Sequence, residues 1–175
     1  MAVKSIPEGY HSVTPYLVVR GAEQTIDFLK KAFGAKVAFD PMKRPDGTIL
    51  HTEVEIADSP VMIAEASDEH PPMPCMLYLY VADVDATYRQ ALAAGGTKMK
   101  EPEDQFFGDR TAGVKDPSGN HWEIATRKED VTPQEIKKRA EQMFKQGSKA
   151  AYRVPAAHAG TGVCRFTLRP DRRRA

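Results

Sequence analysis

Hydrophobic and polar positions alternate in short runs along the chain, and twice such a run leads into a stretch with helical spacing. In the first stretch Ile26, Leu29 and Phe33 recur at three- and four-residue intervals before Gly34, which is typical of a helix that stops at glycine. Two-residue alternation between turn residues indicates half-buried strands. The pattern predicts helices at 25–33 and 84–94, and strands at 13–19, 36–40, 48–56, 61–66, 76–81, 97–100, 110–115 and 121–126.

The predicted elements belong to an internal repeat. Tyr16, Leu17, Val19, Thr25, Ala32 and Gly34 recur 62 positions later as Tyr78, Leu79, Val81, Thr87, Ala94 and Gly96. Each copy has the order strand, helix and three strands, in modules of about 10–66 and 75–127. We therefore predict an α+β fold, with two tandem βαβββ modules that form a curved sheet around a cleft.

The remainder of the chain has a different pattern. We assign residues 1–128 to the repeated domain and 129–147 to an appended helix, because Thr132, Pro133 and Glu135 form a helix start signature. Residues 148–175 contain alanine, glycine, proline and arginine with little periodicity. This segment is predicted to be a disordered, flexible basic tail.

Charge is distributed unevenly along the chain. The total of 25 basic and 24 acidic side chains gives a net charge of +1, but residues 147–175 hold seven of the basic and one of the acidic residues. Residues 1–146 therefore carry 18 basic and 23 acidic side chains. A core of that sign repels phosphate backbones, which argues against nucleic-acid binding by the core.

The sequence also predicts a cytoplasmic protein. Residues 1–8 lack the apolar segment of a signal peptide, and no apolar run approaches the roughly 18 residues of a membrane span. Cys75 and Cys164 are far apart in the sequence, so no disulfide framework is expected.

Strand alternation sorts the side chains onto two faces, one under the helix and one lining the cleft. On the helix side we expect Val13, Leu17, Val19, Leu50, Val54, Ile56, Trp122 and Ile124. On the cleft side we expect Thr14, Tyr16, Val18, His51, Glu53, Glu55, Met76, Tyr78, Tyr80, His121, Glu123 and Ala125. Apolar walls with a few polar groups suit a small organic ligand, and Thr14, Tyr16, Met76, Tyr78, Tyr80 and His121 are the predicted ligand-binding residues.

Each of these side chains also has a purely structural interpretation. His51 beside two glutamates is typical of a solvated or hydrogen-bonded surface residue, and tyrosines suit any half-buried strand. Glu123 lies between two large apolar residues, so its carboxylate needs a partner, and a functional role is as well supported as a structural one. Asp109 and Arg110, adjacent in a loop, are interpreted as a local ion pair.

Five stretches together resemble the vicinal oxygen chelate superfamily, which includes the glyoxalase and bleomycin-resistance proteins, and most closely its PhnB-like branch. They are Thr14-Pro15-Tyr16-Leu17, residues 22–34, His51-Thr52-Glu53, Phe107-Gly108-Asp109-Arg110 and Asp116-Pro117-Ser118-Gly119-Asn120-His121-Trp122-Glu123-Ile124. The resemblance covers about residues 10–127 and implies the paired-module fold and a homodimer. Members of the superfamily include lyases, ring-cleaving dioxygenases, isomerases, antibiotic-modifying enzymes and proteins that sequester a drug.

In metal-dependent members, His, Gln or Glu side chains from the first and last strands of both modules bind a divalent ion. By position, the resemblance places these ligands at Thr14, at Ala64 or Glu65, at Met76 and at Glu123. Only Glu123 is clearly suitable, since zinc, nickel and iron prefer imidazole or carboxylate ligands to threonine and methionine at such sites. The ligand set is incomplete, so we assign no metal residues and expect no cofactor.

The sequence therefore favours a metal-independent small-molecule binding protein of the glyoxalase/bleomycin-resistance type, whose clefts hold a planar or aromatic ligand against Tyr16, Tyr78 and Tyr80. The alternative is an enzyme, a lyase, isomerase or dioxygenase, in which Glu123 with His51 moves a proton or holds a metal with water in the missing positions. A structural or regulatory role through the basic tail is a third option.

Overall fold

The computed structural model describes residues 3–145 of the 175-residue chain, so the predicted tail at 148–175 lies outside the described residues. The first module contains β1 (Tyr16–Val19), α1 (Ala22–Phe33), β2 (Lys36–Lys43), β3 (Ile49–Ile56) and β4 (Ser59–Glu65). The second contains β5 (Met76–Tyr80), α2 (Val84–Ala93), β6 (Thr97–Asp104), β7 (Asp109–Lys115) and β8 (His121–Arg127), and α3 (Pro133–Lys145) follows.

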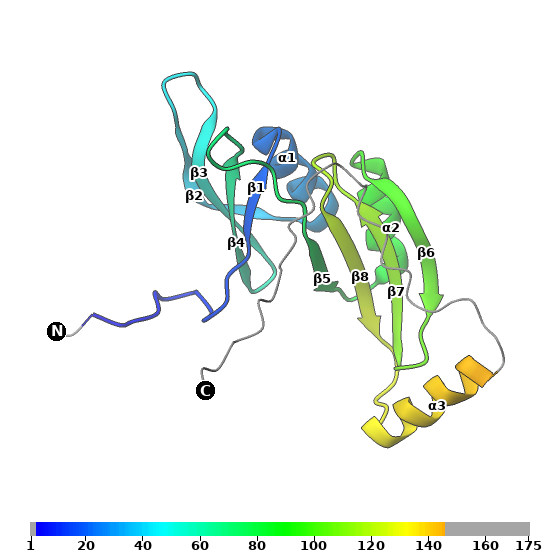
Figure 1. Ribbon diagram of the computed structural model, residues 1–175. Coiled ribbons are helices and arrows are strands. Elements are labelled where there is room, and N and C mark those ends of the chain that lie inside the picture. Colours follow the sequence, from blue (N-terminus) through cyan, green and yellow to red (C-terminus); the bar gives the residue numbers. More distant parts are fainter. Residues whose placement is uncertain (1–2, 146–175) are drawn as a thin grey trace, which may run out of the picture.

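Each module forms its own four-stranded sheet, with the order β1-β4-β3-β2 in the first and β5-β8-β7-β6 in the second (Figure 1). In both sheets the first strand runs parallel to the last strand of its module, and the other pairings are antiparallel. The shared topology confirms the predicted α+β fold of two βαβββ modules.

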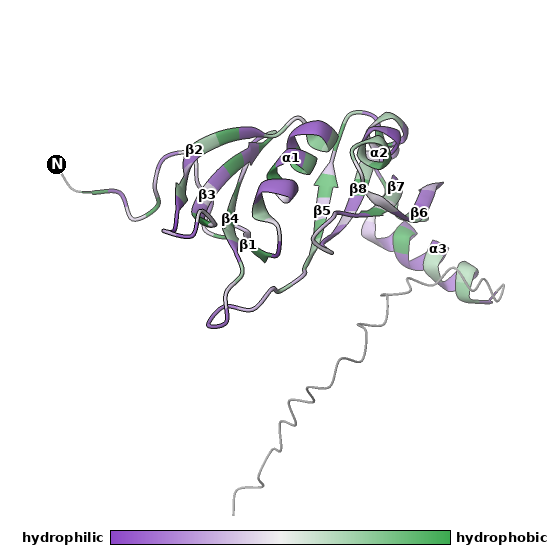
Figure 2. Cartoon of the chain, turned by 90° about the horizontal axis from the view of Figure 1, so that it is seen from above, coloured by the Kyte–Doolittle hydropathy of each residue, from purple (hydrophilic) through white to green (hydrophobic). Residues whose placement is uncertain are grey.

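The two helices α1 and α2 lie on the same side of the molecule, each against one face of its own sheet, and they contact each other (Figures 1 and 2). Gln90 of α2 donates a hydrogen bond from its side-chain amide to the Lys31 carbonyl of α1, with a nitrogen–oxygen distance of 2.7 Å. Phe33 at the end of α1 packs against Trp122 of β8, with ring centroids 4.9 Å apart. The apolar side chains of both modules form one core cluster, so neither module buries its helix alone.

Two residues expected in the core are on the surface. Val13 is 84% exposed because β1 begins only at Tyr16, after Pro15. Leu50 is 46% exposed, and Ile49 is buried in its place. The pairing explains this exchange: the consecutive residues Met42 and Lys43 of β2 face His51 and Ile49 of β3, so Leu50 is an extra residue in a β-bulge.

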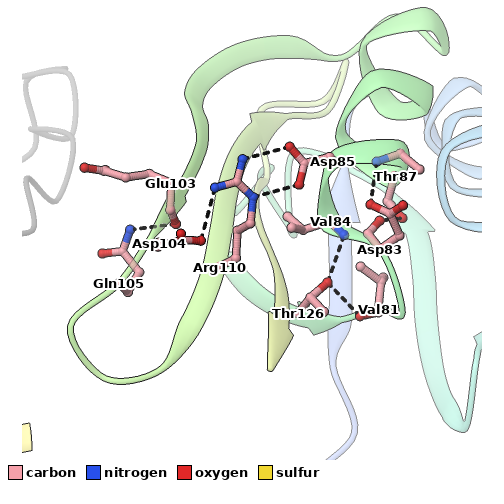
Figure 3. A network of polar contacts seen from close by, with 11 residues as sticks. Val81, Asp83, Val84, Asp85, Thr87, Glu103, Asp104, Gln105, Arg110 and Thr126 are labelled. Atoms are coloured by element: carbon pink, nitrogen blue, oxygen red, sulfur yellow. Dashed lines mark hydrogen bonds and ion pairs between the residues drawn. The ribbon is translucent and has the colours of Figure 1, made fainter. Parts of the chain in front are cut away.

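Arg110 of β7 joins the second sheet to α2 (Figure 3). Its guanidinium donates two hydrogen bonds to the Asp85 carboxylate, at 2.7 and 2.9 Å, and one to Asp104 at 3.1 Å. The expected ion pair between Asp109 and Arg110 is therefore wrong. Because neighbouring strand residues point to opposite faces, Asp109 lies on the face away from α2.

The appended helix α3 lies beyond the end of the second sheet and buries none of its residues (Figure 1). Arg139 attaches it to the preceding segment through two hydrogen bonds of 2.8 Å to the Glu129 carboxylate. Within residues 3–145, no helix is both long and apolar enough to cross a membrane.

Replacing Trp122 by alanine is expected to lower the free energy of unfolding by about 3 to 5 kcal/mol. The side chain is 1% exposed, packs on Phe33 across the junction between the modules, and donates its indole N–H to Asp116 at 3.1 Å. Urea unfolding followed by circular dichroism measures the effect, and Trp122→Phe, which keeps most of the packing, should lose less. A loss below about 1 kcal/mol for Trp122→Ala would contradict a core role for this ring.

Candidate functional site

Aromatic and apolar side chains are exposed on the face of each sheet that carries no helix, which we call the open face. In the second module Tyr78 and Tyr80 remain 45% and 57% exposed, and Met76 on the same strand is also exposed. In the first module Tyr16 is exposed on the equivalent strand. Exposed apolar patches of this kind mark sites of interaction more often than plain surface.

Tyr78 and Tyr80 of β5 lie across the second sheet. Both hydroxyls donate to Oδ2 of Asp109, at 3.1 and 2.8 Å, although Asp109 belongs to β7 and β8 runs between the two strands. Ala125 of β8 is fully buried on this open face because the tyrosine rings cross above it. Each ring is thus held at its Cα and at its hydroxyl, and the ring centroids lie 5.2 Å apart with the ring planes tilted by 54°. We call this exposed aromatic pair the tyrosine platform.

Asp109 is the residue that holds the platform, and the sequence interpretation missed it. Gly108 before it has a φ of 97°, and a Cβ at this position would lie 2.4 Å from the Glu129 carbonyl oxygen, so only glycine fits here. Asp109 is 2% exposed, and Arg127 lies 3.4 Å from its Oδ1. Alternation along β7, which puts Asp109 on the face of Thr111, is the signal that could have revealed it.

The platform shifts the acidity of its tyrosines. Burial, together with the charge of Asp109 and the hydrogen bond to it, raises the pKa of Tyr78. For Tyr80 the hydrogen bond to Asp109 is the main cause of a raised pKa, and burial adds to it. Both phenols therefore stay protonated to higher pH than a free tyrosine.

Glu123 lies on the open face beside Tyr78, with Trp122 and Ile124 on the helix side. Its carboxylate is almost fully buried, and Nε2 of His121 lies 3.3 Å from Oε2. Burial by itself raises the pKa of Glu123, but His121, Thr111 and the charge of Lys100 outweigh it, and the net shift is downward. Glu123 is thus an ionised residue with protein partners.

A second polar chain crosses the first module in the same manner. Tyr16 of β1 reaches over β4 to His51 of β3, with 3.2 Å between the hydroxyl and Nδ1. Nε2 of His51 lies 3.1 Å from Oε1 of Glu53, and the Tyr10 hydroxyl donates to the other oxygen of that carboxylate. The hydrogen bond from Tyr10 is the main cause that lowers the pKa of Glu53. Tyr10 precedes every predicted strand, so no sequence signal indicated it.

A cavity of about 910 Å³ adjoins this chain on the first module. The connection between β4 and β5 borders it, because Met73 in that connection donates its backbone N–H to the Val18 carbonyl at 3.0 Å. Its lining combines apolar and charged side chains, namely Tyr16, Leu50, Met73, Arg44, Asp68 and His70 among others. A smaller groove of about 260 Å³ between the modules is lined by Val13, Ile56, Leu77, Leu79 and Trp122 among others.

The structure separates several residues that the sequence analysis grouped together. His51 lies on the first sheet with Tyr16 and Glu53, whereas Glu123 lies on the second sheet with His121. Thr14 lies before β1, and its hydroxyl donates to the His11 carbonyl at 3.2 Å.

The residues at the metal positions implied by the family do not fit a metal. The two carboxylate oxygens of Glu65 accept the backbone N–H groups of Gly21 and Ala22 at the start of α1, at 2.9 and 2.7 Å. Thr14 and Met76 carry no imidazole or carboxylate, so Glu123 is the one suitable ligand left among these positions. Residues 3–145 contain no cluster of three or more His, Cys, Asp or Glu side chains placed to hold a metal ion.

Comparison with known proteins gives a family match over the region of the two modules. Residues 9–124 match the model of the Glyoxalase/Bleomycin resistance protein/Dioxygenase superfamily. An uncharacterized protein of Mycobacterium bovis is 36% identical over 139 residues, covering 71% of this chain and 89% of that protein. A protein of Mycobacterium tuberculosis, also uncharacterized, matches at the same identity over 79% of its length.

Solved structures share the fold at lower identity. TioX from Micromonospora sp. ML1 superposes with a TM-score of 0.54 at 22% identity, over 70% of this chain and all of TioX. TnmS3, an antibiotic binding protein from Streptomyces sp. CB03234, gives 0.53 at 22% identity, over 73% of this chain and 98% of TnmS3. A glyoxalase-related enzyme from Fulvimarina pelagi gives 0.55 at 18% identity, over 67% and 88% of the two chains.

Alkaline titration of the tyrosines tests the platform. In the folded protein, part of the tyrosinate absorbance at 295 nm should appear at higher pH than in urea, because the folded-state pKa values of Tyr78 and Tyr80 are raised. Stability from these phenols is therefore fully present below the unfolded pKa of about 10 and is lost as pH rises toward the folded value.

Two matched variants identify the group that raises the pKa values of Tyr78 and Tyr80. Asp109→Asn removes the buried charge and should bring the contribution of Tyr78 and Tyr80 to lower pH, whereas the contribution of Tyr10, whose pKa is raised by its hydrogen bond to Glu53, should stay delayed. Asp104→Asn, an exposed acid that contacts Arg110, should leave both contributions unchanged. Simultaneous titration of all tyrosines in the folded wild-type protein would contradict the hydrogen bonds to Asp109.

Proposed function

We propose that this chain, which belongs to the Glyoxalase/Bleomycin resistance protein/Dioxygenase superfamily, binds a small aromatic molecule on the open faces of its sheets. The observation that carries the proposal is the tyrosine platform, in which Tyr78 and Tyr80 expose their rings while Asp109 fixes both hydroxyls. Rings that are already immobilised lose little conformational entropy when an aromatic ligand packs against them. TnmS3, an antibiotic binding protein, shares this fold.

We further propose that binding needs no metal. Glu65 caps α1 with both oxygens, and moving it to a metal would leave two backbone N–H groups without their acceptor. Glu123 alone supplies one carboxylate where catalytic zinc takes about three protein ligands.

The working form that we propose is a cytoplasmic homodimer of the PhnB-like type. Within one chain the open face of each sheet is exposed to solvent. One copy therefore supplies only one wall of a cleft. A second copy would supply an opposite wall and cover side chains such as Phe39 and Met42, which are each more than 40% exposed.

One observation favours an enzyme as the second candidate function. Tyr16, His51, Glu53 and Tyr10 form a continuous hydrogen-bonded chain beside the 910 Å³ cavity. An imidazole that is oriented by a carboxylate and contacts a phenol is a suitable arrangement for proton transfer. Turnover that disappears in His51→Gln but survives in Glu123→Gln would favour this alternative.

Binding of 2-methoxynaphthalene, a neutral flat probe, tests the proposed function by ligand-observed NMR. Tyr80→Ala removes half of the platform and should weaken binding about three- to tenfold, the effect expected for one aromatic pair. Tyr88→Phe is the control, because Tyr88 lies buried on α2 and its hydroxyl has no hydrogen-bond partner among residues 3–145. Dialysis against EDTA should leave the affinity unchanged. Absence of binding to the wild-type protein would refute the platform as a ligand site. Loss of binding after dialysis against EDTA would show that binding depends on a metal.

Sedimentation equilibrium tests the homodimer. The expected mass is twice the 19.4 kDa of one chain. Phe39→Glu, which places a charge on the exposed open face, should shift the equilibrium toward monomer, whereas Lys145→Glu on the exposed side of α3 should not. A monomer at micromolar concentration would contradict the dimer.

A further inference from the structure

The direction of each hydrogen bond on the platform determines whether the tyrosine hydroxyls can donate a hydrogen bond to a ligand or only accept one. A phenol has a single proton, and Tyr78 and Tyr80 both donate theirs to the same oxygen of Asp109. Asp109 is 2% exposed and an ionised carboxylate only accepts, so the direction cannot be reversed. The tyrosine oxygens therefore retain lone pairs but have no proton to donate to a ligand.

In the first module the tyrosine hydroxyls also donate their protons to protein acceptors. The Glu53 carboxylate accepts from Nε2 of His51, which places the proton of a neutral imidazole on Nε2. Nδ1 of His51 then accepts the proton of Tyr16. Tyr10 likewise donates to Glu53. The four tyrosine hydroxyls described on the two open faces are therefore all donors to the protein.

The cations near the platform are engaged by protein groups. Arg127 lies 3.4 Å from Asp109 and 3.3 Å from Asp130. Lys100 donates to Thr111 at 3.2 Å and lies 3.7 Å from Glu103. Glu123, ionised and beside Tyr78, adds negative potential on the same face.

We infer that the ligand is an aromatic compound that carries an ammonium or amine N–H group, and that aromatic acids are rejected. This inference rests on the proposed function and adds the chemical class. An N–H group can donate to the free lone pairs of the tyrosine oxygens, and a cation is attracted to the faces of the rings. The carboxylate of an aromatic acid only accepts hydrogen bonds, as the tyrosine oxygens of the platform do. The two sets of acceptors would therefore repel each other.

Three probes with one ring system separate the inference from the proposed function: 2-naphthylmethylammonium, 2-methoxynaphthalene and 2-naphthoate. Wild-type protein should bind the ammonium about tenfold more tightly than the neutral ether, and the naphthoate most weakly. If the ether binds and the naphthoate binds as well as the ammonium, the inference fails and the proposed function stands. If none of the three binds, both fail.

Tyr80→Phe provides the variant that isolates the hydroxyl. It keeps the ring face and leaves Asp109 with Tyr78 and Arg127 as partners, so the fold should persist. Affinity for the neutral ether should stay within about twofold, while the advantage of the ammonium over the ether should fall about threefold or more. Tyr88→Phe should change neither affinity, because that hydroxyl lies on the helix side of the sheet. An undiminished advantage in Tyr80→Phe would show that the hydroxyl oxygen does not select the ligand.

Discussion

The buried carboxylate of Asp116 organises the junction on which both modules depend. It accepts hydrogen bonds from the backbone N–H groups of Ser118 and Asn120, from the Asn120 side chain and from the indole of Trp122. Through these partners it fixes the turn that leads into β8 and turns Trp122 toward Phe33 of α1. The same turn reaches the other module, since Ser118 donates to the Arg20 carbonyl at 2.8 Å. An unpaired carboxylate at 3% exposure would be strongly destabilising, so these contacts form together or not at all.

The orientation of β8 decides which side chains are available for function. Once Trp122 faces the helices, alternation puts Glu123 and Ala125 on the open face. Ala125 is small enough for Tyr78 and Tyr80 to pass over it and reach Asp109 on the next strand. The first module repeats the plan with Tyr16, which crosses its own last strand to reach the third. A duplicated fold thus produces two similar surfaces. In one the tyrosine hydroxyls donate to a carboxylate, and in the other the tyrosine hydroxyl donates to an imidazole.

The sequence was sufficient to predict the helices and strands and, for most strands, which side chains are buried, because the period of the hydrophobic residues shows which side of a strand faces the core. It failed at Leu50, where a bulge in the pairing of β2 with β3 shifts the register by one residue. The tyrosines were recognised from alternation, but their common acceptor was not. Asp109 is 31 residues from Tyr78, and only the order β5-β8-β7 brings them together. Tyr10 belongs to no periodic segment, so nothing in the pattern of the chain could link it to Glu53.

Superfamily membership identifies the scaffold, and the chemistry of the open faces must come from their own side chains. At positions where the family resemblance places metal ligands, this chain has a helix cap at Glu65 and side chains without imidazole or carboxylate groups at Thr14 and Met76. The polar groups that remain have protein partners: the protons of Tyr78 and Tyr80 go to the buried Asp109, and Glu123 lies beside His121 and Thr111. Such a surface is preorganised in both shape and hydrogen-bond direction before any ligand arrives. The ligand that we propose must match an arrangement of acceptors that cannot rotate, and hydroxyl protons that are already donated to protein groups are not free for the proton exchange that a general acid requires.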